Sequence, residues 1–163
     1  MRPFDFIAYW FWAVCLVFGF VNYRRASRQT QARLVADPQR AAMAERLLRR
    51  FALLMAVPWL VMGVGVLLGG VPGVWHYFRP QDGNPYVIAW IASVFALSVA
   101  FAVWVFACDG AARMTEFGLT GLFGGRGGMP RSPLGIKLMA AAGPFFTLFW
   151  IWLVITMNAP VPH

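Results

Sequence analysis

Few side chains in this sequence have the type and spacing that catalysis or metal binding requires. Cys15 and Cys108 lie inside or at the end of apolar runs and form no CxxC pair, so the pattern of a disulfide framework or cysteine metal site is missing. His76 and His163 lie outside the apolar runs, where they cannot ligate a haem between helices. We therefore predict no catalytic residue, no metal and no cofactor, although a bound lipid is compatible with the sequence.

Arginine is the functional residue type that the chain concentrates. The polar stretch 23–50 holds eight of the fourteen basic residues and separates two long apolar runs. Basic residues beside an apolar run favour anionic lipid headgroups as partners, which argues against nucleic acid despite the net charge of +8. The arginines predicted to contact lipid headgroups or a partner protein are Arg24, Arg25, Arg33, Arg40, Arg49 and Arg50.

A glycine-rich segment at 124–128 is a second candidate for anion binding. Its sequence GGRGG resembles loops whose backbone N–H groups cradle a phosphate. However, no strand precedes it, and the P-loop and dinucleotide-binding patterns are both absent. We favour a flexible connector within a loop that spans 109–133.

The composition predicts a membrane protein with one domain over 1–163. Hydrophobic residues make up 60% of the chain and charged residues 12%, whereas soluble domains have about 45–50% and about 25%. A bilayer core of about 30 Å is crossed by about 20 apolar residues. Four such runs are present, at 4–23, 51–74, 86–107 and 134–157. We expect the first run to be retained as a span, because no signal-cleavage pattern ends it.

The fold class predicted is therefore an all-α integral membrane protein with four transmembrane helices. Between spans one and two, residues 24–50 are expected to form a basic cytoplasmic helical hairpin. Asp37 suits an N-cap and Pro38 a first helical position, so one helix should end near Val35 and the next begin at Pro38. The alternative is a basic segment that lies flat on the lipid surface.

The distribution of charge predicts the orientation of these spans. Basic loops stay in the cytoplasm, and twelve of the fourteen basic residues lie in 24–50 or 109–137. Both termini then face outward, and a bacterial inner membrane is the expected location.

Small residues at helical spacing predict two packing stripes. One is Gly65, Gly69 and Gly73, and the other is Ala92, Ala96 and Ala100. Small residues four apart let a neighbouring backbone approach closely. We expect the two stripes to face each other within the chain, although the glycine stripe also suits contact between chains. Pro58 and Gly143-Pro144 are expected to kink spans two and four.

Tryptophan is concentrated toward the outward side of this topology. The six residues are Trp10, Trp12, Trp75, Trp90, Trp150 and Trp152. Tryptophan is enriched at membrane interfaces, so an outer aromatic belt is the first interpretation. An aromatic-lined site for a lipid, a quinone or a partner is the alternative.

These features favour a non-catalytic accessory or assembly subunit of a larger membrane complex. The expected partners are the anionic bilayer and either other membrane subunits or further copies of the chain. The alternative is a small transporter, channel or lipid- or quinone-binding protein. An enzyme that acts on lipid headgroups through the arginines is a third, weaker reading, because no acid–base pair accompanies them.

Overall fold

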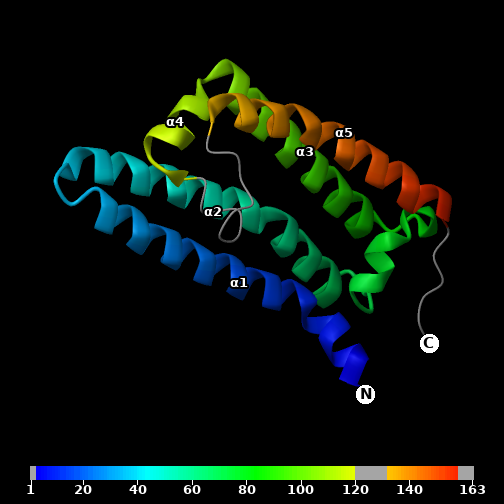
Figure 1. Cartoon of the computed structure of the whole chain (residues 1–163). Coiled ribbons are helices and arrows are strands. Elements are labelled where there is room, and N and C mark those ends of the chain that lie inside the picture. Colours follow the sequence, from blue (N-terminus) through cyan, green and yellow to red (C-terminus); the bar gives the residue numbers. More distant parts are fainter. Residues whose placement is uncertain (1–2, 120–131, 158–163) are drawn as a thin grey trace.

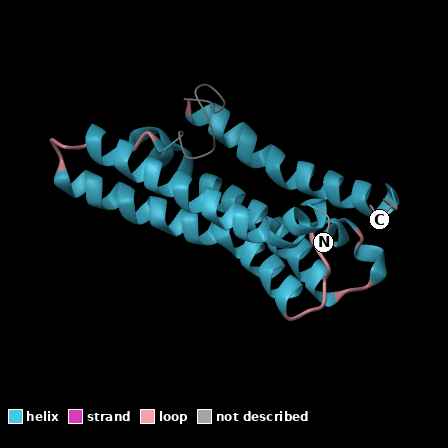
Figure 2. Cartoon of the chain, turned by 90° about the horizontal axis from the view of Figure 1, so that it is seen from below, coloured by secondary structure: helices cyan, strands magenta, loops and turns pink. Residues whose placement is uncertain are grey.

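The computed structural model describes residues 3–119 and 132–157, and this part of the chain is helical apart from short connections (Figures 1 and 2). The long helices are α1 (Pro3–Arg33), α2 (Pro38–Leu67), α3 (Pro85–Ala107) and α5 (Pro133–Met157). The shorter elements are α4 (Gly110–Glu116) and the 3₁₀ helices η1 (Val74–Phe78) and η2 (Pro80–Asp82). The prediction of four long apolar helices is confirmed, because each long helix is apolar enough to cross a membrane.

Local capping explains where most of these helices begin. Asp37 accepts a hydrogen bond from the backbone N–H of Arg40 at 3.0 Å, and Pro38 occupies the first helical position of α2. Asn84 caps α3 in the same way, accepting from the N–H of Tyr86 at 3.0 Å. Both starts follow from a short polar side chain that satisfies an otherwise unpaired N–H group.

The end of α2 differs from the sequence prediction. The helix stops at Leu67, and Gly70 then adopts a left-handed backbone conformation with φ of 65°. Pro72 cannot donate a backbone hydrogen bond, which also disfavours further helix. Gly69 and Gly73 therefore lie beyond α2, and of the three glycines predicted on one helix face only Gly65 belongs to the helix.

The long helices pack in the order α1, α2, α3, α5, and Figure 1 shows α1 and α5 on opposite sides of this arrangement. We call the end with the α1–α2 turn and α4 the hairpin end. The loop end carries the N-terminus of α1, η1, η2 and the C-terminus of α5. In Figure 1 the α1–α2 turn lies farther out than the ends of α3 and α5, so the two helices project as a hairpin.

Three apolar clusters hold these elements together. At the loop end, Tyr77 and Trp90 pack with side chains from α1, α2 and α3. At the hairpin end, Met114 of α4 is buried between Val105 of α3 and Ile136 of α5. A third cluster joins Leu119 to the hairpin itself. The short helix α4 and the residues after it thereby connect the α3–α5 pair to the α1–α2 hairpin.

Candidate functional site

The carboxylate of Glu45 makes the main polar contact between the two arms of the hairpin. Tyr23 donates a hydrogen bond from its hydroxyl to Glu45 Oε1 at 2.6 Å. Ser27, one turn farther along α1, donates to Glu45 Oε2 at 2.7 Å. Both carboxylate oxygens thus accept hydroxyl hydrogen bonds from the opposite arm. The sequence analysis did not identify Glu45. The sequence does distinguish this residue, because it is the only acid on the α2 arm, which carries four arginines.

Most of the hairpin arginines have no carboxylate to neutralise them. Arg40 is the exception, because it pairs with Asp37 at 3.9 Å and also with Glu116. Arg33 instead donates to the carbonyl oxygen of Gly118 at 3.5 Å. Within residues 3–119 and 132–157, no carboxylate pairs with the other six arginines, which are Arg24, Arg25, Arg28, Arg46, Arg49 and Arg50.

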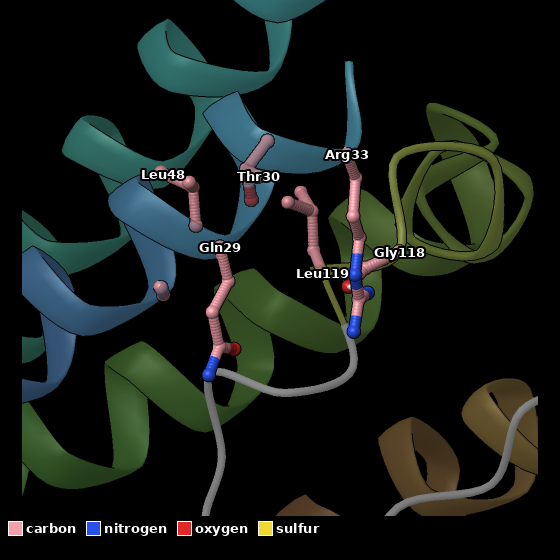
Figure 3. A pocket seen from close by; sticks show the side chains of 7 residues that line it. Gln29, Thr30, Arg33, Leu48, Gly118 and Leu119 are labelled. Atoms are coloured by element: carbon pink, nitrogen blue, oxygen red, sulfur yellow. Dashed lines mark hydrogen bonds between the residues drawn. The ribbon is translucent and has the colours of Figure 1, made fainter. Parts of the chain in front are cut away.

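The segment after α4 covers the hairpin where Arg33 and Thr30 lie. Figure 3 shows Leu119 and Gly118 beside Thr30 and Arg33, with Leu48 contributed by α2. The space left between them is about 10 Å³, which is no larger than a single water requires. This region is therefore a packed contact between the hairpin and α4, with no room for an organic ligand.

A larger groove lies between α1 and α2 on the loop-end side of the Glu45 contact. Its volume is about 520 Å³, within the range of about 300–1,000 Å³ that small-molecule sites occupy. Gly19 leaves it open, because a β-carbon there would meet nothing within 4 Å. The lining side chains come from both helices and include Cys15, Leu16, Phe20, Asn22, Tyr23, Arg49, Ala52, Met55 and Trp59. The groove is apolar along most of its length and polar at its hairpin end.

A second groove lies on the other side of α2, against α3. It measures about 200 Å³ and is lined by Arg50, Leu54, Leu97, Ala100 and Trp104 among others. The ring of Phe51 lines both grooves and makes an edge-to-face contact with Trp104 at a centroid distance of 4.9 Å. Each groove therefore has one arginine of the pair Arg49 and Arg50 at its hairpin end.

The predicted glycine and alanine stripes do not meet each other. A β-carbon at Gly65 would overlap the hydroxyl of Tyr77, and one at Gly69 would overlap the ring of Tyr86. A β-carbon at Gly73 would instead lie 3.2 Å from the backbone of Ala8. The prediction that the two stripes pack against each other is therefore wrong. The side chains of Tyr77 and Tyr86 occupy the space beside Gly65 and Gly69 instead.

The alanine stripe faces away from this contact. Ala92, Ala96 and Ala100 are all exposed on α3 in the described chain. A close approach that the sequence reasoning missed joins α1 to α2, where a β-carbon at Gly63 would lie 2.7 Å from the indole of Trp12.

The six tryptophans of the predicted belt divide into two groups. Trp10, Trp75 and Trp152 are exposed, as an interfacial belt requires. Trp12, Trp90 and Trp150 pack into the loop-end cluster, where Trp90 contacts the rings of Tyr77, Phe78 and Trp150. This inner group forms part of the core.

Cysteine and histidine take no part in a shared site in the described residues. Cys15 lines the groove between α1 and α2, whereas Cys108 is exposed at the end of α3. No three histidine, cysteine, aspartate or glutamate side chains converge within residues 3–119 and 132–157. The predicted glycine-rich segment at 124–128 lies outside the described residues.

Comparison with protein-family models, with curated proteins and with solved structures found no match to this chain.

Proposed function

We propose that this chain is an integral membrane protein that acts as a non-catalytic accessory or assembly subunit of a larger membrane complex. In this proposal the four long helices cross the bilayer of a bacterial inner membrane. The hairpin of 24–50 then lies in the cytoplasm, and both termini face outward. The excess of basic residues in 24–50 and 109–137 supports this orientation.

The observation that carries the subunit role is the unneutralised charge on a projecting element. Seven of the eight hairpin arginines, all except Arg40, lack a carboxylate partner in the described chain, and all seven are exposed, as Arg28 and Arg46 are. Each such charge near an anionic surface contributes about 1 kcal/mol, over a screening length of about 8 Å. Arg28 and Arg46 each lie five residues, or about 7.5 Å along the helix, from the nearer apolar run. This is at the outer edge of that screening length, and in this proposal they contact an acidic protein surface.

Two of the arginines predicted to contact a partner protein make contacts within the chain. Arg40 pairs with Asp37 and Glu116, and Arg33 contacts Gly118. Both side chains are turned toward the α4 segment, and the charge of Arg40 is also neutralised by its two acids, so in this proposal they are less available to another protein. The unpaired Arg28 and Arg46 are therefore the better candidates for partner contact.

Purification of the tagged chain from its native membranes in mild detergent tests this proposal. We expect a stable heteromeric complex, and we expect Arg28→Gln/Arg46→Gln to lose the partner. The matched control is Arg33→Gln/Arg40→Gln, which removes the same charge from the internally paired positions and should keep the partner. A lone homo-oligomer from the wild-type chain would contradict the subunit role, and partner retention in both variants would remove the hairpin from the interface.

The alternative function is a small transporter, channel or lipid- or quinone-binding membrane protein. The two grooves beside α2 favour lipid or quinone binding within this group, because both are apolar and open. Pro58 and Pro144 inside α2 and α5 are the features that favour a transport pathway.

A further inference from the structure

We propose that the groove between α1 and α2 binds one anionic phospholipid, with an acyl chain along the groove and the phosphate at Arg24 and Arg49. This inference rests on the lipid-binding alternative above and names its ligand class. It does not require a protein partner.

The shape of the groove suits one acyl chain. The helices are held together at its hairpin end by Tyr23 and Glu45, and toward the loop end by Trp12 and Gly63. Between these contacts, Gly19 and Ala52 leave space that larger side chains would fill. The open stretch is therefore bounded at both ends along the helix axes.

The length of the groove matches one leaflet of a bilayer. From Cys15 to Tyr23 the α1 side rises about 12 Å at about 1.5 Å per residue. Half of the hydrocarbon core of a bilayer is about 15 Å thick. A chain that starts at the hairpin end and runs toward Cys15 would thus lie at the depth that an acyl chain of that leaflet occupies.

The polar groups gather at the end where a headgroup would lie. Arg49, Asn22 and Tyr23 line the groove there. Arg24 stacks over the ring of Phe20, with its guanidinium carbon 5.7 Å from the ring centroid, and Phe20 also lines the groove. Arg24 directly follows Tyr23 in α1, and Arg49 lies one turn after Glu45, which accepts the Tyr23 hydrogen bond. Two cations thus flank the same end of one groove.

The charge of these arginines selects an anion. The nearest acid along α2 is Glu45, one turn before Arg49, and both of its oxygens accept hydroxyl hydrogen bonds. No carboxylate pairs with Arg24 or Arg49 in the part of the chain that the structure describes. Phosphate oxygens accept strong charge-assisted hydrogen bonds from guanidinium groups. A zwitterionic headgroup brings a cation of its own, and a quinone brings no charge, so neither complements this end as well.

Lipid-dependent stability of the purified chain tests the inference. Phosphatidylglycerol and, separately, phosphatidylcholine are titrated into detergent-solubilised protein, and Tm is measured at each concentration. A ligand that binds the folded state raises Tm, so we expect phosphatidylglycerol to raise Tm far more than phosphatidylcholine. Native mass spectrometry should find one phosphatidylglycerol bound per chain.

Two variants address the two parts of the site, each with a matched control. Gly19→Phe should fill the groove and abolish the phosphatidylglycerol effect, whereas Gly143→Phe, at another position where a β-carbon meets nothing within 4 Å, should retain it. Arg24→Gln/Arg49→Gln should raise the phosphatidylglycerol concentration at half-effect about tenfold or more, as loss of a charge-assisted contact predicts. Arg28→Gln/Arg46→Gln removes equal charge outside the groove, at positions assigned above to a protein partner and not to lipid, and should leave that concentration unchanged.

The remaining outcomes contradict the anionic headgroup, the location in the groove, or lipid binding as a whole. Equal effects of both lipids that Gly19→Phe abolishes would keep lipid binding in the groove but refute the anionic headgroup. A phosphatidylglycerol effect that persists in Gly19→Phe, in a protein that keeps its lipid-free Tm, would refute the groove as the site. If neither lipid raises Tm and mass spectrometry finds none bound, both the inference and the lipid-binding alternative fail.

Discussion

The hydroxyl of Tyr77 donates a hydrogen bond to the carbonyl oxygen of Met62 at 2.8 Å, across the surface of Gly65. Tyr77 is fully buried and belongs to η1, so this bond ties the connection between α2 and α3 to the body of α2. Only a glycine at position 65 leaves room for the phenol. The loop end therefore depends on a small residue in one helix and an aromatic residue in the next connection.

Substitution of Gly65 by alanine should destabilise the protein. The new β-carbon would overlap the Tyr77 hydroxyl, and overpacking of this kind costs about 1–3 kcal/mol. We expect a lower Tm in detergent. Gly19→Ala is the control, because its β-carbon meets nothing within 4 Å and Tm should not fall.

A second substitution should recover part of that loss. Tyr77→Phe alone removes the hydrogen bond to Met62, at a cost of about 1 kcal/mol. In the double variant with Gly65→Ala, the phenyl ring lacks the oxygen with which the β-carbon overlaps. A Tm for the double variant above that of Gly65→Ala would confirm the contact, whereas a simple sum of the two losses would contradict it.

Alkaline pH should destabilise the protein through the same tyrosine. Burial raises the pKa of Tyr77 to about 12 from its ordinary value of 10.0. Because the unfolded chain releases this proton at a lower pH than the folded chain, stability is unaffected below about pH 10 and falls between about pH 10 and 12. The expected loss is about 1–3 kcal/mol.

Measurement of Tm against pH tests this, with Tyr77→Phe as reference. The difference between the wild type and the variant isolates Tyr77 from the other tyrosines. It should be constant up to about pH 10 and then shrink. Parallel curves up to pH 12 would mean that Tyr77 does not titrate differently in the folded state.

Local signals in the sequence predicted the helices well. Asp37-Pro38 is a cue that acts over a few residues, and it starts α2 where a helix was predicted. Hydropathy alone predicted the run at 86–107, and α3 covers Pro85–Ala107 with Asn84 as a cap that the sequence analysis did not identify. The end of α2 was placed too late, at Val74, because hydropathy continues past Leu67 while Gly70 and Pro72 stop the helix. The 3₁₀ helices of η1 and η2 have no comparable local signature and were predicted only as a loop.

Relations between helices were less accessible from the sequence. Helical spacing placed Ala92 and Ala96 on one face of α3, but spacing does not say which face meets a neighbour, and these residues are exposed. The groove beside Gly19 arises from the separation of two helices between two contacts. The partners of Glu45 depend on the register of α1 against α2, which no pattern within either helix encodes.

Removal of the Glu45 carboxylate should loosen the hairpin. Glu45→Ala leaves the hydroxyls of Tyr23 and Ser27 without their acceptor, at a cost of about 1 kcal/mol at this half-buried position. Hydrogen exchange of the backbone amides in both arms should accelerate. Glu45→Gln, which keeps one acceptor oxygen, should restore part of the protection, and Asp82→Ala, which removes a carboxylate paired with Arg79 at the loop end, should leave the arms unchanged. Equal exchange in Glu45→Ala and the wild type would show that apolar packing alone holds the arms.

The proposed orientation predicts which loops a reagent reaches from outside the cell. In a Cys15→Ser/Cys108→Ser background, a membrane-impermeant maleimide should label Asp82→Cys on intact cells but not Gln39→Cys. Both positions are exposed on the protein, so permeabilised cells should label at both and serve as the control. The reverse pattern on intact cells would invert the topology and place the hairpin outside.

The hydrogen bonds of Glu45 have a consequence for the order in which the chain is assembled during synthesis. All three side chains of this contact belong to α1 and α2. The hydrogen bonds that join the two arms can therefore form before the residues beyond α2 emerge from the ribosome. Leu119, which completes the apolar cluster over Ala26 and Leu48, is made after α3. The first two helices can thus pair as an early unit, and Leu119 packs against them only after the third helix has been synthesised.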